Sequence, residues 1–127
     1  MFNNTGIKKE TYGNVKQILK NVDLQESVGI VVDETAGVLN SAGRKIVKAG
    51  TPLKGNLDER TTAFTASTLG TDAVGVLLHD VDVTTGDNNG TLLIFGFVNT
   101  NRLENDVKEK ITSEVKTALP MIKFIAC

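Results

Sequence analysis

The stretch HDVDV, which begins at residue 79, contains the side chains best suited to chemistry. Residues two apart on a strand face the same side, roughly 7 Å apart, so Asp80 and Asp82 form a carboxylate pair of the kind used in glycoside hydrolysis or metal binding. His79 is the only histidine, and a general base also needs an orienting partner and a nucleophile. The alternation favours a half-exposed strand, with Val81 and Val83 facing inward and both aspartates facing water. We therefore predict no catalytic residue here.

Motifs for metals, phosphates and nucleophiles are missing from the chain. The stretch from His79 to Gly90 resembles a calcium loop only superficially, because Thr85 stands where such a loop needs glycine and the closing glutamate is missing. The sequence contains no G-x-x-x-x-G-K-[ST], G-x-G-x-x-G, C-x-x-C, H-E-x-x-H or G-x-S-x-G pattern. We expect no metal site, no cofactor and no enzymatic activity.

Length, charge and cysteine content narrow the class of protein. The 127 residues fit one domain, and a net charge of −1 lacks the basic excess that a nucleic-acid binder uses to displace counterions. Cys127 is the only cysteine, so a disulfide framework within one chain is excluded. No apolar stretch approaches the length of a membrane span, and the first residues do not resemble a signal peptide. We expect a soluble protein made in a cytoplasm, without nucleic-acid or membrane partners.

The middle of the chain, from Ser27 to Val98, has the pattern of short strands separated by turns. The last of these strands, Thr91 to Val98, is apolar on both faces and is therefore expected to be central and buried. Asn89-Gly90 suits a hairpin turn between it and the preceding strand. The other predicted strands are Val28 to Val32, an edge strand at Arg44 to Lys48, and Ala73 to Val83, with a long polar loop from Asn56 to Asp72.

A single helix is predicted from Asn101 to Leu119. Asn101 followed by Glu104 resembles a capping box, and Pro120 ends the helix. The helix would bury an apolar stripe of Leu103, Val107, Ile111, Val115 and Ala118, and would carry the i,i+4 pairs Glu104–Lys108 and Asp106–Lys110. Residues 121–126 can form a last short strand. The predicted fold class is α+β, β-dominated, a small and mostly antiparallel β domain with one C-terminal helix.

Residues 1–26 are predicted to form an N-terminal arm ahead of a β-rich domain at residues 27–127. The first dozen residues have no periodicity and are expected to be mobile. Val15, Ile18, Leu19 and Val22 have the spacing of one apolar stripe on a short helix. The arm is a disordered tail, an extra packed helix, or a segment that becomes ordered on a partner, for example by adding a strand to the edge of the partner's sheet.

The order of these pieces resembles the phage lambda type of head decoration, or head-stabilising, protein, and also similar proteins of phages of Gram-positive bacteria. The resemblance is carried by Arg44-Lys-Ile-Val47, by Ala73-Val-Gly-Val-Leu77 and by Arg102-Leu-Glu104 after the hairpin strand. It extends over about Ser27 to Ala126, which is most of the chain.

The resemblance implies a structural virion protein. Such a protein would be made in the host bacterial cytoplasm and would bind as a homotrimer to the outside of an expanded capsid. Its partner would be the major capsid protein, and it would stabilise the shell against the pressure of packaged DNA. The arm would contact the shell, and its candidate residues are Phe2, Ile7, Tyr12, Val15, Ile18 and Leu19.

Three other functions remain open at this point. The first is a different virion component, such as a tail or adhesion module. The second is a small carboxylate-dependent enzyme that uses Asp80, Asp82 and His79. The third is an oligonucleotide-binding β-barrel, which would need aromatic stacking platforms although the chain has only five Phe and one Tyr.

Overall fold

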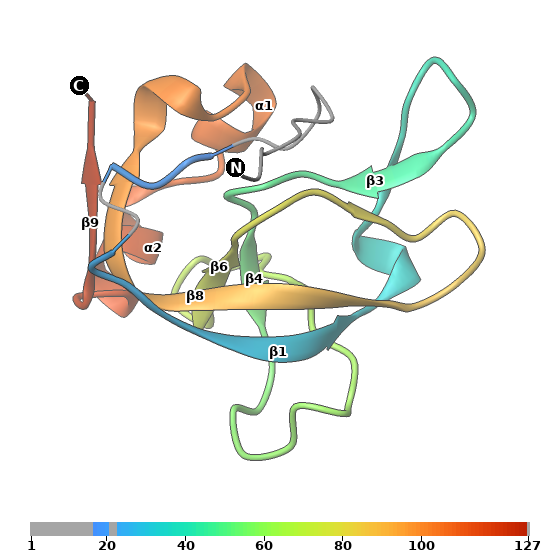
Figure 1. Cartoon of the computed structure of the whole chain (residues 1–127), viewed down its shortest axis with the longest axis horizontal. Helices are drawn as coiled ribbons and strands as arrows, with labels where there is room; N and C mark the ends of the chain where they lie inside the picture. Colours follow the sequence, from blue (N-terminus) through green and yellow to red (C-terminus); the bar gives the residue numbers. More distant parts are fainter. Residues whose placement is uncertain (1–16, 21–22, 127) are drawn as a thin grey trace, which may run out of the picture.

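The computed structural model describes residues 17–20 and 23–126, and it confirms the α+β, β-dominated fold class. Strand β8 (Asn88–Asn99) runs through the middle of the molecule (Figure 1). Its neighbouring residues Leu92 and Leu93 point to opposite faces and are both fully buried, which confirms the predicted central strand. Three strands pair directly with β8. They are β1 (Glu26–Val32), β6 (Gly75–Leu77) and β9 (Ile122–Ile125).

Two sheets make up the fold. The larger has the strand order β1-β8-β6-β4-β5 with antiparallel pairing, and β9 joins β8 in parallel. The smaller has the order β2-β3-β7 and is antiparallel throughout. The remaining strands are β4 (Pro52–Lys54), β5 (Thr65–Ala66), β2 (Val38–Leu39), β3 (Lys45–Val47) and β7 (Val81–Asp82), with a 3-10 helix at Glu34–Ala36. Strand β3 lies between β2 and β7, so the prediction that it is an edge strand was wrong.

The predicted single helix from Asn101 to Leu119 was also wrong. The structure has three short helices there instead: a 3-10 helix at Thr100–Arg102, α1 (Asn105–Lys108) and α2 (Ser113–Ala118). Side-chain N-caps start separate helices within the segment. The Asn99 side chain accepts the Asn101 N–H at 3.0 Å, and the Thr112 hydroxyl accepts the Val115 N–H at 3.3 Å. Asn101 therefore lies inside the first of these helices and does not cap one.

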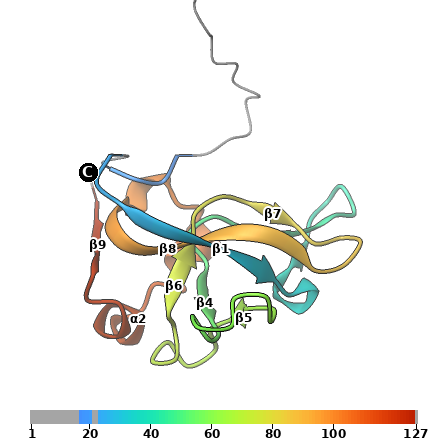
Figure 2. The same ribbon diagram turned by 60° about the horizontal axis from the view of Figure 1, so that its bottom comes forward.

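The apolar spacing of this segment nevertheless predicted its burial correctly. Leu103, Val107 and Val115 are buried in one core cluster, and Ile111 packs against it. This cluster also contains Val98 of β8, and it joins the helical segment to the end of the sheet (Figures 1 and 2). A second cluster lies around Val32, Leu53, Phe64, Leu77 and Leu92.

The long predicted strand and hairpin at residues 73–98 differ from the structure in two ways. A bend at Leu78 and His79 divides the first strand into β6 and β7, which belong to different sheets. Asn89 and Gly90 lie within β8, where they pair with Val31 and Ile30 of β1. The turn comes earlier, where the Gly86 N–H donates to the Val83 carbonyl at 3.2 Å and Gly86 has a φ of +132°.

Residues 17–20 are extended, so the predicted helix does not form in the described part of the N-terminal zone. Leu19 forms an antiparallel bridge with Val98, and the Lys20 N–H donates to the Phe97 carbonyl at 2.9 Å. Ile18 and Leu19 are 0% and 2% exposed and belong to the first core cluster. The two large side chains are thus buried beside β8, in the core cluster that also contains Val98.

Candidate interaction surfaces

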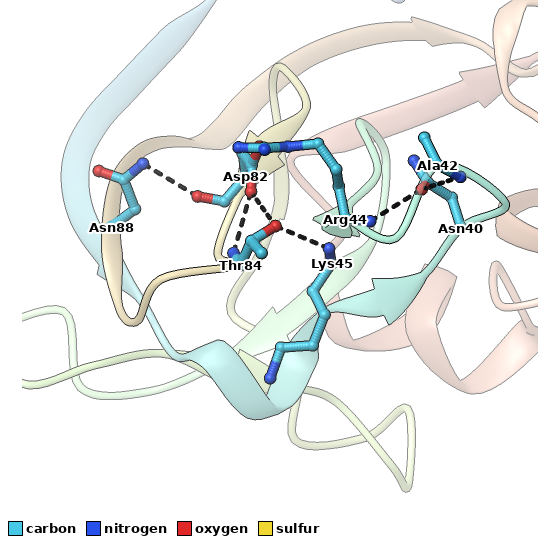
Figure 3. Close-up of polar contacts among 7 residues, drawn as sticks. All are labelled: Asn40, Ala42, Arg44, Lys45, Asp82, Thr84 and Asn88. Atoms are coloured by element: carbon cyan, nitrogen blue, oxygen red, sulfur yellow. Dashed lines mark hydrogen bonds and ion pairs between the residues drawn. The ribbon is translucent and has the colours of Figure 1, made fainter.

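Asp82 has a structural role in the smaller sheet. Its carboxylate accepts the Arg44 Nε–H at 2.6 Å and the Thr84 backbone N–H at 2.9 Å, and it also accepts the Thr84 hydroxyl (Figure 3). These bonds favour the charged form, so those from Thr84, followed by Arg44, lower the pKa of Asp82 to about 2. The Thr84 hydroxyl also accepts the Lys45 N–H at 2.8 Å, which ties β7 to β3. Both carboxylate oxygens are therefore used within the fold.

Asp80 and His79 are placed apart from this network. The Asp80 carboxylate accepts the Ala49 N–H at 2.7 Å and holds the turn after β3. His79 is half-buried, and its Nδ1 has no hydrogen-bond partner within the described residues. The described bonds do not join His79, Asp80 and Asp82 into one site. No group of three or more His, Cys, Asp or Glu that could hold a metal occurs within residues 17–20 and 23–126.

Alternation along this stretch follows the prediction. Val81 and Val83 are 7% and 0% exposed, whereas Asp80 is exposed and Asp82 is half-exposed. The predicted alternation of buried and exposed side chains is confirmed, although only Val81 and Asp82 lie in a strand, and the carboxylates serve the fold by accepting bonds from nearby groups.

Lys48 makes the charged contact between the β3 side of the molecule and the helical segment. Its Nζ lies 3.1 Å from Glu104 Oε1 and 2.9 Å from Asp106 Oδ2. The hydrogen bonds that the Lys48 ammonium donates to Asp106, and then to Glu104, raise the pKa of Lys48, and the same ammonium lowers the pKa of Asp106. The two acids thus pair with Lys48 across the fold, whereas the sequence had assigned them to lysines four residues further along a helix.

Strand β2 exposes two adjacent apolar side chains. Val38 is 50% and Leu39 is 66% exposed, and β2 is the outer strand of the smaller sheet. Asn40 and Arg44 close the β2–β3 hairpin through the bond from the Asn40 N–H to the Arg44 carbonyl, so by strand alternation the Leu39 backbone groups point away from β3. A small cavity beside the hairpin is lined partly by Val38, Leu39 and Ile46. Apolar side chains next to an open strand edge are typical of protein contact surfaces.

The outer edge of β1 is also open, over part of its length. The Val31 N–H donates to the Arg60 carbonyl at 3.3 Å and the Val31 carbonyl accepts the Phe64 N–H at 2.8 Å, so the backbone groups of Val31 point away from β8. By the period of two, those of Ser27 and Gly29 point the same way. Along this edge lies an open groove lined by Gly29, Ile30, Val31, Leu57, Asp58, Glu59, Arg60, Thr61, Thr62, Asn89 and Gly90. This surface could not be predicted from the sequence, because the loop that lines the groove comes from a distant part of the chain.

The arm candidates divide into two groups. Phe2, Ile7, Tyr12 and Val15 lie outside the described residues, as does Val22 of the predicted stripe. Ile18 and Leu19 are core residues of this chain, and their burial leaves them no surface to offer a partner in this structure.

The comparisons with known proteins do not assign a family. No protein-family model matches the chain, and no curated protein matches it either. Among the described residues, no helix is long and apolar enough to cross a membrane.

Proposed function

We propose that this protein is a structural virion component that decorates the outside of an expanded phage capsid as a homotrimer and stabilises the shell. The carrying observation is the outer strand β2, where Val38 and Leu39 are half or more exposed next to an unpaired strand edge. A free monomer leaves this apolar surface in water, whereas assembly would bury it. The β-dominated fold agrees with what the sequence resemblance implies.

The hydrogen bonds of Asp80 and Asp82 also support this proposal over an enzymatic role. Asp80 and Asp82 bond to backbone and side-chain groups of the fold, and the described bonds do not join the two carboxylates to each other. A small enzyme using these carboxylates remains the second candidate, and the half-buried His79 with its unpaired Nδ1 is the observation that favours it. If the protein is such an enzyme, Asp80→Asn should abolish its activity. If it is a decoration protein, Asp80→Asn should leave its binding to the shell unchanged.

In the proposed assembly, the β2 side contributes to contacts between copies, and the major capsid protein is contacted by the N-terminal segment through Phe2, Ile7, Tyr12 and Val15. Three segments on one trimer bind multivalently, so individually weak contacts can sum to tight attachment, with avidity higher by ~10² or more. A closed trimer is an ordinary protein symmetry.

The test uses the full chain in light scattering and in co-sedimentation with expanded phage heads that lack their own decoration protein. We expect a trimer that sediments with expanded heads, and a lower trimer fraction for Leu39→Ser. Leu69→Ser is the matched control, because Leu69 is 71% exposed but lies in a loop outside the strands. A monomer that stays in the supernatant would overturn the proposal, and equal behaviour of the two variants would remove β2 from the trimer contact.

A further inference from the structure

Strand β9 has an open outer edge. It pairs only with β8, and on that side the Gly96 N–H donates to the Met121 carbonyl at 3.2 Å. By the period of two, the backbone groups of Ile122 and Phe124 point away from β8. The Ile122 N–H on the outer side is used, because it donates to the Leu119 carbonyl at 3.1 Å. The Ile122 carbonyl and both backbone groups of Phe124 have no partner within the described residues.

The free part of the β1 edge lies on the other side of β8. Neighbouring residues of β8 direct their backbone groups to opposite sides. Gly96 bonds toward β9, whereas the Phe97 carbonyl accepts the Lys20 N–H from the segment that precedes β1. On the outer side of β1, the backbone groups of Ser27 and Gly29 are directed away from β8. The same sheet thus carries two short open edges that face in opposite directions.

When two copies are set edge to edge, these edges match in the groups that each leaves unpaired. An antiparallel pairing that places Phe124 opposite Ser27 also places Ile122 opposite Gly29. The Ile122 N–H is already used within its own chain, and the Gly29 carbonyl already receives Arg60 Nη1 at 3.4 Å. These are the two groups that would otherwise bond to each other. The remaining Gly29 N–H and Ile122 carbonyl can therefore pair without competition, as can the groups of Phe124 and Ser27.

Exposed apolar and charged side chains agree with the same register. Met121 directly precedes β9 and is 60% exposed, and the register places it beside the groove that runs along β1. Leu57 in the wall of that groove is 40% exposed. Pairing would cover both apolar side chains, and it would bring the exposed Lys123 toward the exposed carboxylates of Asp58 and Glu59.

We propose that the β9 edge of one copy pairs antiparallel with the free β1 edge of the next copy, with Phe124 opposite Ser27. The contact is heterologous, so each copy uses a different edge toward each of its two neighbours, as a cyclic trimer requires. This contact rests on the proposed homotrimer, but it does not involve β2. It also covers two strand edges that could otherwise pair with unrelated chains.

Directed disulfide formation tests the pairing. Lys123→Cys and Val28→Cys are each introduced into the full chain with Cys127→Ser, because the register places positions 123 and 28 opposite each other at a spacing that a disulfide can span. We expect a covalent dimer when the two variants are expressed together and oxidised, and none when either is oxidised alone. A chain carrying both new cysteines should give covalent trimers. Lys116→Cys is the matched control for Lys123→Cys, because Lys116 is an exposed lysine of α2 that lies off the strand edge.

The cross-linking results separate this contact from the proposed function. Cross-linking of Lys123→Cys with itself would mean that β9 pairs with β9 across a twofold axis, and it would overturn the proposal. Equal cross-linking by Lys116→Cys, or covalent chains longer than trimers, would also overturn it. A trimer in light scattering that does not cross-link would remove this contact and leave the proposed assembly. Covalent trimers that do not sediment with expanded heads would support the contact and remove the shell function.

A second pair of variants tests the hydrogen bond at the free edge of β1. Gly29→Pro removes the N–H that would donate to the Ile122 carbonyl of the next copy, so the trimer fraction in light scattering should fall. Gly29→Ala keeps this N–H, and a side-chain carbon there meets no atom within 4 Å in its own chain, so the trimer fraction should be retained. Retained hydrogen-exchange protection in β8 verifies that both variants are folded. An unchanged trimer fraction for a folded Gly29→Pro variant would overturn the proposal.

Discussion

Strands β7 and β1 are both outer strands of their sheets, but their edges are treated in different ways. On the outer side of β7, the Asp82 carbonyl accepts the Asn88 side-chain N–H at 3.0 Å (Figure 3). On the inner side, the Thr84 hydroxyl, just after β7, accepts the N–H of Lys45 in the neighbouring strand β3. On β1, the outward groups of Ser27 and Gly29 have no comparable bonds within the described residues, apart from the long contact of Arg60.

This difference follows from the side chains available at each edge. Asp, Thr and Asn are short polar residues that readily bond to nearby backbone, and the segment 82–88 is rich in them. The segment 26–30 offers Glu, Ser, two apolar residues and a glycine. An edge closed by its own side chains contributes to the stability of the fold, whereas an edge left open is available to another strand.

The largest expected effect compares a glycine on the open edge with one inside the sheet. A side-chain carbon added at Gly75 of β6 would lie 2.6 Å from the Leu93 carbonyl oxygen and 2.7 Å from Leu92 Cγ, whereas one at Gly29 meets nothing within 4 Å. Because the Leu93 backbone belongs to the central strand, Gly75→Ala should lower the free energy of unfolding by about 1–3 kcal/mol. Gly29→Ala should keep or slightly increase it. Urea unfolding of both variants measures the contrast, and equal losses would contradict it.

The next effect concerns acid stability of the closed edge. Asp82 has a pKa of about 2 in the folded protein, below the ordinary value of an aspartate, so the unfolded state binds its proton first as the pH falls. The stability that Asp82 contributes is therefore complete above about pH 4 and is lost as the pH falls toward 2. Asp82→Asn should flatten this part of the curve of unfolding free energy against pH.

The relative size of the interactions that lower the pKa of Asp82 allows a sharper test of its acid dependence. The bonds from Thr84 lower the pKa more than the Arg44 guanidinium does. Thr84→Val should therefore reduce the acid dependence more than Arg44→Gln does, when urea unfolding is measured from pH 2 to 6. The opposite order would mean that charge attraction from Arg44, and not the local turn at Thr84, holds the Asp82 carboxylate in its charged form.

The sequence predicted the central strand and the burial of the helical segment better than the boundaries of its elements. Periodicity placed Leu103, Val107 and Val115 in the core because the spacing of apolar residues is set by what packs on β8. It did not reveal that Asn99 and Thr112 cap separate helices, since capping depends on backbone geometry at those residues. One continuous helix and several short ones bury nearly the same positions.

The local sequence pattern could not predict how distant segments of the chain pair with each other. Asn89-Gly90 has hairpin-turn chemistry, yet the antiparallel pairing of β1 with β8 keeps both residues extended. Ile18 and Leu19 were predicted to lie on an arm helix because their spacing fits one. In the structure the segment is extended, because its backbone pairs with Val98 and Phe97 of β8. The groove beside β1 could not be predicted at all, because the loop at residues 57–62 meets β1 only in the folded chain.

The smallest effect tests whether charge adds to the closed side of the molecule. Lys48 follows β3, the partner of β7, and its side chain pairs with Glu104 and Asp106, which are themselves about half exposed. Partial exposure screens such pairs, so Lys48→Met should lower the free energy of unfolding by only about 0.5 kcal/mol near neutral pH, and added salt should reduce the difference. Lys108→Met is the matched control, because a continuous helix would have paired Lys108 with Glu104. Urea unfolding at low and high salt should show a larger loss for Lys48→Met than for Lys108→Met. Equal losses would mean that Glu104 is shared between the two lysines, and that the contact across the fold does no more than a local helical pair.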